Sequence, residues 1–442
     1  MIFGVAIMVC SICAAANNNQ YAAVAKSESD ITEIETTLTL EQCIEISLRN
    51  NPAVAQKQWE ADTAQAEKDI AQGRLWPEIS ANAGYMHYRD YRLIQPRRPG
   101  TSESLQFTDE LVSGGVVLNL PLYTGGRLVN QVKAADFITQ STKQQLLFSQ
   151  AELVFNVSSV FYSILGQREV ITSLIFSQKT LQEHYRKTME LLNAKKAARV
   201  DLLRTEVRLA DIEQRIIYER NALNITQSLM ISLLGLNIQN KTPDIEGELM
   251  MIDVPAGLGR GLETALTNRQ DYKSLKSQLE AQQEILNIAK AGRLPEVSLR
   301  ASYGNRWDAD SSEDNLIGDI GIFVVIPIFE GGRIDAEIRR ERSRLRAHKE
   351  ALRKLELHIR LEVESAISNI ESTRARVGVM QKAVEQARES LRIEREKYDQ
   401  GKGAIVDVLD AQSAMLESQT NYYRSLSDYN TAVAQFRLAV GE

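Results

Sequence analysis

The chain has very few cysteines for its 442 residues. Of the three present, Cys10 and Cys13 lie in an apolar stretch at the start, which leaves Cys43 alone in the rest of the chain. A single thiol cannot form an internal disulfide. The mature fold is therefore expected to hold without one.

Residues typical of catalytic and metal sites are also scarce. The four histidines are His87, His184, His348 and His358, and they lack the spacing of metal ligands. The glycine-rich run at residues 257–261 follows no predicted strand, which argues against a nucleotide loop, and the sequence contains neither a P-loop nor a nucleophile elbow. We therefore expect no enzyme activity, no metal site and no cofactor.

A basic surface and a long apolar helix are missing too. The formal net charge of −6 argues against nucleic acid as a partner. After the first residues, no stretch is apolar enough to cross a membrane as a helix. Residues 2–13 are nearly all apolar, and the small-residue site Ala23-Val24-Ala25 follows them, which is the pattern of a secretory signal. We expect residues 1–25 to be a signal peptide and residues 26–37 a short tail.

Proline is confined to a few joints. The nine prolines leave residues 122–242 and 328–442 free of proline, and both stretches are rich in helix-forming residues. We expect two long helices, each with a returning partner: 126–195 with 201–234, and 332–400 with 407–440. Shorter helices are expected at about 40–50, 53–72, 262–269 and 271–291.

Apolar residues spaced by seven mark a coiled-coil seam along each long helix. The first seam contains Val157, Ile164, Ile171, Tyr185 and Leu192 and is interrupted by Gln178. The second contains Val363, Ile370, Val377, Val384, Leu391 and Tyr398. Globular cores do not need helices of this length, whereas coiled coils and conduits do.

The chain contains an internal duplication. Residues 50–85 align without gaps on 268–303, and residues 115–235 align on 321–441. Both copies carry a Pro-x-x-x-Gly-Gly-Arg segment, beginning at Pro121 and Pro327. We therefore divide the chain into a first repeat at 38–236, a linker at 237–260 and a second repeat at 261–442.

Each repeat also carries a pair of predicted strands, at about 77–122 and 295–329. Apolar and polar residues alternate in them, so the two faces of the sheet meet different solvents. We expect strands of about 9–11 residues, a length that crosses a bilayer when tilted. Tyr85, Tyr303 and Trp307 are candidates for an aromatic girdle at the interface. A soluble sheet with one face on a core remains the alternative.

Four strands cannot close a wide barrel, and lipid does not tolerate unpaired strand edges. Several chains must therefore pool their strands, and rotational symmetry is the natural way to do so.

The most specific motif is Tyr398-x-x-Gly401-x-Gly403-Ala404-Ile405-Val406-Asp407-Val408-Leu409-Asp410-Ala411. With the two Pro-x-x-x-Gly-Gly-Arg segments, it resembles the TolC-like outer-membrane efflux protein family over nearly the whole mature chain. The resemblance implies a mainly α fold with a transmembrane β part. It implies a homotrimer with a twelve-stranded β-barrel in the outer-membrane lipid, a coiled-coil tunnel in the periplasm and a small belt that includes the linker.

The resemblance also implies a function. The chain would be the passive exit duct of a tripartite efflux or type I secretion system, serving a periplasmic adaptor (membrane fusion) protein and an inner-membrane pump, and would export small molecules or proteins. A periplasmic coiled-coil adaptor or a structural protein is the alternative.

The same resemblance suggests gate residues. It implies that Asp407 and Asp410 line the periplasmic constriction of the tunnel as a selectivity ring. Acids favoured by the dipole of a helix start are the alternative. Asp201 and Tyr398 match an acid and a tyrosine of the family's gate lock. Gly403 stands where the family has an arginine, so the adjacent Lys402 is a further candidate.

Overall fold

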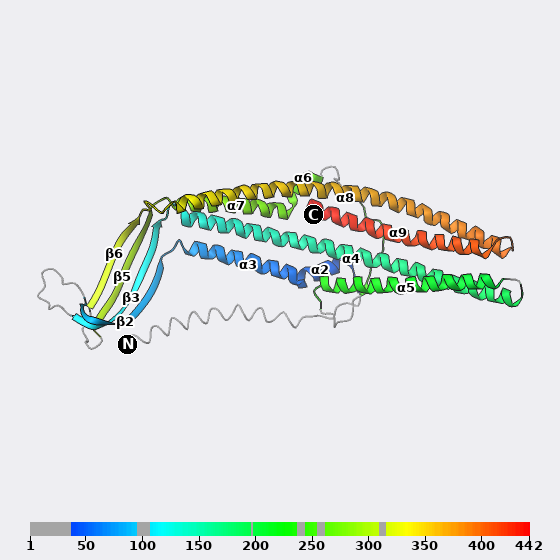
Figure 1. The fold of residues 1–442 in the computed structure, drawn as a ribbon, viewed down its shortest axis with the longest axis horizontal. Coiled ribbons are helices and arrows are strands. Elements are labelled where there is room, and N and C mark those ends of the chain that lie inside the picture. Colours follow the sequence, from blue (N-terminus) through cyan, green and yellow to red (C-terminus); the bar gives the residue numbers. More distant parts are fainter. Residues whose placement is uncertain (1–36, 95–106, 196–197, 237–243, 254–260, 309–314) are drawn as a thin grey trace.

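The computed structural model describes residues 37–94, 107–195, 198–236, 244–253, 261–308 and 315–442. The expected signal peptide lies outside these residues, as does nearly all of the tail. The molecule is long and narrow, with one sheet at one end and the tips of two helical hairpins at the other (Figure 1).

The sheet has four antiparallel strands in the order β2-β3-β5-β6. They are β2 (Glu78–Leu93), β3 (Phe107–Tyr123), β5 (Glu296–Asp308) and β6 (Asn315–Val325). With 16, 17, 13 and 11 residues, three of them exceed the expected 9–11. Ladder pairing extends them beyond the alternating segments. Pro121 lies within β3 beside a register shift, whereas its twin Pro327 follows the end of β6.

The register places most of the apolar residues of the four strands on one face. Ala81 pairs with Val116, Val116 with Tyr303, and Tyr303 with Gly318. The opposite face carries mostly small and polar residues, such as Ser80, which pairs with Val117 opposite Ser302. The two-faced sheet inferred from alternation is therefore present.

Helices make up most of the rest of the described chain. In the first repeat they are α2 (Leu40–Asn50), α3 (Pro52–Gly73), α4 (Arg127–Asn193) and α5 (Arg199–Leu233), and in the second they are α6 (Gly261–Asn268), α7 (Gln270–Ala291), α8 (Arg333–Asp399) and α9 (Ile405–Val440). Both α4 and α8 have 67 residues, about 100 Å of helix. All lie within about two residues of their expected bounds.

The middle part of each expected seam lies in the core of the helical part. Val157 and Ile164 of α4 are fully buried, and Val363 and Ile370 of α8 are nearly so. Along its length α4 packs against α3, α5, α7 and α9, and α8 packs against α7 and α9. No helix described here is both long and apolar enough to cross a membrane.

Paired glycines connect each strand pair to the long helix that follows it. Gly125 and Gly126 have φ values of 61° and 83°, and their twins Gly331 and Gly332 have 59° and 81°. Two successive left-handed residues are costly for any residue with a Cβ. The shared Gly-Gly-Arg segment is thus a backbone requirement that the duplication has kept.

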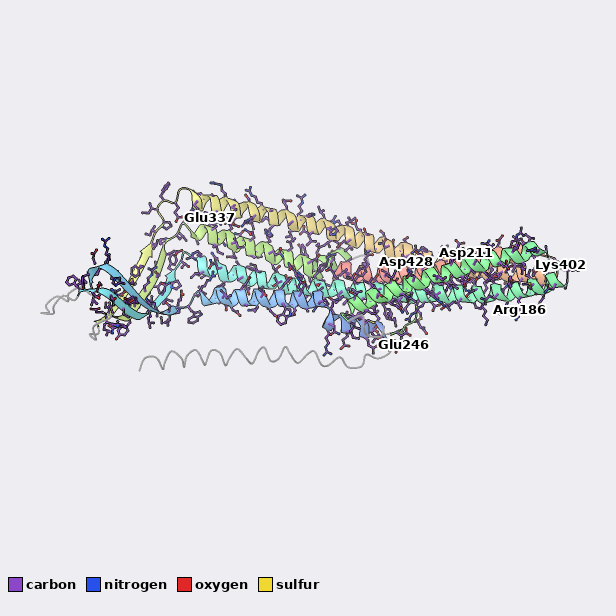
Figure 2. The ribbon with its side chains drawn as sticks, turned by 60° about the horizontal axis from the view of Figure 1, so that its bottom comes forward. Arg186, Asp211, Glu246, Glu337, Lys402 and Asp428 are labelled. Carbon is purple, nitrogen blue, oxygen red and sulfur yellow. The ribbon has the colours of Figure 1, made fainter. Side chains whose placement is uncertain are left out.

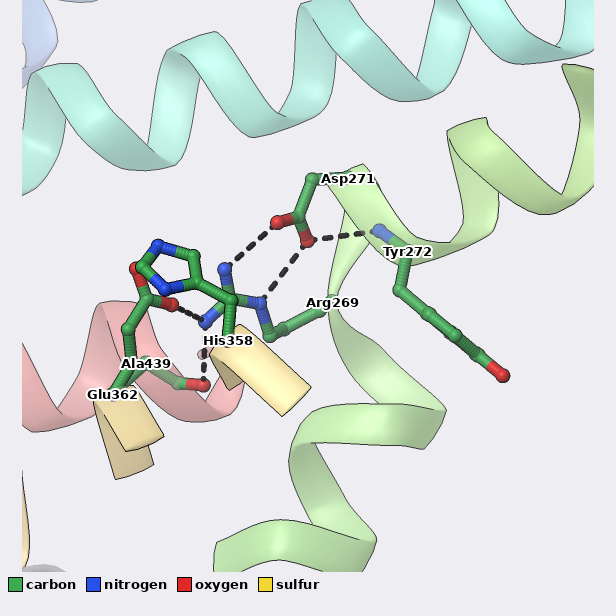
Figure 3. A network of polar contacts seen from close by, with 6 residues as sticks. All are labelled: Arg269, Asp271, Tyr272, His358, Glu362 and Ala439. Atoms are coloured by element: carbon green, nitrogen blue, oxygen red, sulfur yellow. Dashed lines mark hydrogen bonds and ion pairs between the residues drawn. The ribbon is translucent and has the colours of Figure 1, made fainter. Parts of the chain in front are cut away.

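A second joint closes the base of each hairpin. In the first repeat, the Asn51 amide donates to the carbonyl of Leu233 at 2.9 Å, in the last turn of α5. In the second, Arg269 Nη1 donates to the carbonyl of Ala439 at 3.2 Å, in the last turn of α9 (Figure 3). The alignment of 50–85 on 268–303 makes these residues twins. The duplication has kept the contact while exchanging a neutral donor for a charged one.

Two carboxylates form ion pairs with Arg269. Its guanidinium is almost fully buried and forms ion pairs with Asp271 at 2.7 Å and Glu362 at 2.5 Å (Figure 3). Burial opposes the charge, but hydrogen bonds to both carboxylates outweigh it and raise the pKa of Arg269. His358 lies 3.0 Å from the other oxygen of Glu362.

The middle of the molecule holds a small mixed layer. β1 (Thr37–Leu38) pairs in parallel with β4 (Asp244–Ile245), which belongs to the expected linker. Arg168 of α4 donates to the carbonyl of Ile245 at 2.5 Å. Cys43 is buried beside this layer, and burial raises the pKa of its thiol to about 11. The rest of the linker, 237–243 and 254–260, lies outside the described residues.

Candidate functional site at the helical tip

The α4–α5 and α8–α9 turns lie together at the end farthest from the sheet. Figure 2 places Lys402 and Arg186 there and Glu337 near the sheet. Gly401, with φ of 68°, reverses the chain between α8 and α9. A buried cluster that includes Leu181, Ile212 and Leu409 joins α4, α5 and α9 behind the turns.

Asp407 and Asp410 lie in the first turns of α9. Both are exposed, whereas Val408 and Leu409 between them are buried. The buried pair fixes this start of α9 against α4 and α5, and a spacing of three puts both carboxylates on one side of the helix.

The two carboxylates have different surroundings. Asp410 lies 3.2 Å from Arg208 of α5, and both side chains are largely exposed. The Asp407 carboxylate makes no hydrogen bond or ion pair with the residues that the structure describes. One acid therefore links two helices, and the other faces solvent at the tip.

The three lock candidates are near the turns but are not joined. Asp201 lies in the first turn of α5, and the ring of Tyr398 packs against the buried tip cluster. Lys402 Nζ donates to Gln400 at 3.2 Å. Within the described chain, no hydrogen bond or ion pair connects Asp201, Tyr398 and Lys402.

The position of Gly403 has little room for a side chain. A Cβ there would lie 3.1 Å from Lys397 Cβ and 3.2 Å from the backbone nitrogen of Tyr398. The end of α8 would have to shift for a larger residue. An arginine cannot enter this turn as it stands.

Other contacts, which sequence reasoning missed, join the two hairpins. Lys187 of α4 and Asp399 of α8 form an ion pair at 2.6 Å. Further from the turns, the Gln412 amide of α9 donates to the carbonyl of Ser177 of α4 at 3.1 Å, in a buried position. The partners are 212 and 235 residues apart in sequence, and no local pattern pairs them.

A groove runs between α4, α8 and α9 beside these contacts. Its volume is about 670 Å³. Its lining includes the apolar side chains of Leu391, Met415 and Phe176, which is 67% exposed. The charged residues Arg388, Arg392, Glu396 and Asp399 also line it.

The aromatic candidates lie at the other end, in the sheet. Tyr85 and Trp307 both pair with Val112, so they share one level of the apolar face. Tyr303 is on the same face but four residues along β5, about 13 Å away. The three rings therefore occupy two levels of the sheet.

The family model of the outer membrane efflux protein matches residues 43–236 and 261–442. Outer membrane protein TolC of Salmonella enteritidis is 20% identical over 426 residues, covering 93% of this chain and 83% of that protein.

Two solved structures share the fold. The Campylobacter jejuni CmeC outer membrane channel has a TM-score of 0.80 at 16% identity, over 92% of this chain and 86% of that chain. The open state of the Neisseria gonorrhoeae MtrE outer membrane channel has a TM-score of 0.76 at 17% identity, over 94% of both.

Both repeats fall within the family match, and the linker between them separates its two parts. An adaptor or a purely structural coiled coil is set aside, because the match includes the strand pairs as well as the hairpins. The chain belongs to the outer membrane efflux protein family.

Proposed function

We propose that three copies of this chain form the passive exit duct of a tripartite efflux or type I secretion system in the outer membrane. One observation carries the proposal: the sheet has one apolar face and two edge strands, β2 and β6, each of which pairs with a neighbour on one side only in the described chain. Unpaired edges beside lipid are not tolerated. Three four-stranded sheets joined edge to edge would give a closed barrel of twelve strands.

The helices support the same assembly. Exposed apolar residues recur along α5 and α8, where a monomer would leave them in water. They include Val207, Ile217 and Ile225 of α5 and Leu357 and Leu361 of α8. Neighbouring copies would cover these faces and extend the helices into a tunnel.

The duct has to take its cargo, small molecules or proteins, from other proteins. We propose that a periplasmic adaptor protein, linked to an inner-membrane pump, docks in the groove between α4, α8 and α9. A lining of both apolar and charged side chains suits an amphipathic helix. A photo-crosslinking residue at Phe176 should capture the adaptor, and the same residue at Met250, exposed in the middle segment, should not.

We further propose that Asp407 and Asp410 form the gate ring. Threefold symmetry would gather six carboxylates at one level, which concentrates the field in a narrow pore. The Asp407→Asn, Asp410→Asn double variant should lose block by multivalent cations and reduce cation selectivity in planar bilayers.

The control is Asp62→Asn with Asp69→Asn, which removes two exposed acids of α3, far from the tip. It should leave block and selectivity unchanged. Equal behaviour of the gate variant and the wild type would instead favour acids that only cap the start of α9.

A further inference from the structure

Phe323 of β6 is an aromatic residue on the polar face of the sheet. Phe323 of β6 pairs in register with Ser298 of β5, so its ring shares a face with the serine and not with the apolar residues Ile322 and Val324. The ring is 46% exposed. In the proposed barrel this face lines the lumen, so the inference below rests on that proposal.

A glycine makes room for this ring. A Cβ added at Gly321 would lie 3.2 Å from Cε2 of Phe323, closer than ordinary packing allows. Gly321 is also the register partner of Arg300 on β5. The ring therefore leans into the space opposite Arg300 that any other residue at 321 would fill.

The guanidinium of Arg300 covers the ring. Its central carbon lies 5.1 Å from the centroid of Phe323, within the range of a cation–π contact. Arg300 is exposed and makes no hydrogen bond or ion pair with the residues described. The nearby carboxylate of Asp319 accepts instead from the hydroxyl of Ser302. The N–H edges and the outer face of the guanidinium are thus open to a ligand.

These features fit one class of ligand. A guanidinium held flat against a ring can take a carboxylate or sulfonate with two N–H groups while a second ring stacks nearby. Asn119 of β3, which pairs with Arg300, adds an amide beside it. We propose that Arg300, Phe323 and Gly321 form a binding station for aromatic organic anions, present once per chain in the lumen.

The test uses the full chain, extracted from outer membranes and inserted into planar bilayers. Block of the potassium chloride current is titrated with 2-naphthalenesulfonate and with ethanesulfonate. The wild type should be half-blocked at a lower concentration of the aromatic anion. Arg300→Gln and Phe323→Leu should each raise that concentration by about three- to tenfold, the range of a cation–π contact. Arg300→Lys should give a smaller rise, because it keeps the charge without the planar group.

The matched control is Arg306→Gln. Arg306 lies on the same strand and face, is also exposed, and makes no ring contact among the described residues. It should change the half-blocking concentration by less than about twofold. An effect equal to that of Arg300→Gln, or equal block by both anions in the wild type, would overturn the station alone. A wild type that forms no pores would overturn the barrel and the station together.

Discussion

His184 lies on α4 near the tip and is half-buried beside the contact with α8. Burial, and then the charges of Arg395 and Lys187, lower the pKa of His184 from its ordinary 6.5, while Asp399 and Glu183 oppose the shift. The unfolded chain therefore takes up this proton at a higher pH than the folded chain. The stability that depends on neutral His184 is present above about pH 6.5 and falls as the pH drops below it.

His184→Gln should remove this part of the pH dependence. The fall in the thermal midpoint between about pH 7.5 and 5 should be smaller in the variant than in the wild type. His348→Gln, on α8 far from the tip, is the control and should keep the wild-type slope. An unchanged slope in His184→Gln would show that another group gives the pH response.

At the residue scale, the sequence predicts what depends on local pattern. Asp407 and Asp410 are three residues apart and exposed, while the two apolar residues between them face a core. This order of acidic and apolar residues can be read directly from the sequence. The ion pair between Lys187 and Asp399 was not predictable, because it depends on how two hairpins from different repeats pack.

At the element scale, the two glycine pairs share a backbone conformation but differ in how tightly they are packed. Gly125 and Gly331 have nearly the same left-handed φ, but their surroundings differ. A Cβ at Gly125 would lie 2.6 Å from Leu294 Cβ, whereas nothing lies within 4 Å of one at Gly331. The first junction is packed against the α7–β5 turn, and the second is open.

Gly331→Ala should therefore destabilise the protein by about 1–2 kcal/mol from backbone strain alone. Gly125→Ala should cost more, since Leu294 must also move. Gly378→Ala is the control: it lies in α8 with open space around it and should stabilise by about 0.5–1 kcal/mol. The thermal midpoints of the three extracted variants measure the order of their stabilities. Equal effects at 125 and 331 would contradict the packed junction.

Element bounds followed from local signals where such signals exist. Proline-free stretches and the Gly-Gly-Arg segments predicted the long helices closely, because both act on the backbone at the joint itself. Strands β2 and β3 are longer than the expected 9–11 residues. They continue through Met86, His87 and Glu110, where ladder pairing rather than alternation holds the chain extended.

At the scale of the whole molecule, one chain is an incomplete object. It has a sheet with two open edges, long helices with exposed apolar stripes, and acids gathered at one tip. The sequence predicts this incompleteness, because four strands cannot enclose a lumen. It does not predict the register shifts in the sheet, which depend on pairing between strands far apart in the chain.

Thiol cross-linking across the sheet edges tests the central claim directly. A cysteine at Ala81 of β2 is combined in turn with one at Ile320, Ile322 or Val324 of β6, all on the apolar face. Within one chain β3 and β5 separate the two edges by about 14 Å, whereas paired edges of neighbouring copies lie about 5 Å apart. Cys43 is buried with a raised pKa and should give little background.

A short reagent with two thiol-reactive ends should link chains in outer membranes into a ladder that ends at three, and each single-cysteine variant should give none. A ladder that continues beyond three, or the absence of links between chains at every pair, would contradict a closed trimer built from pooled strands.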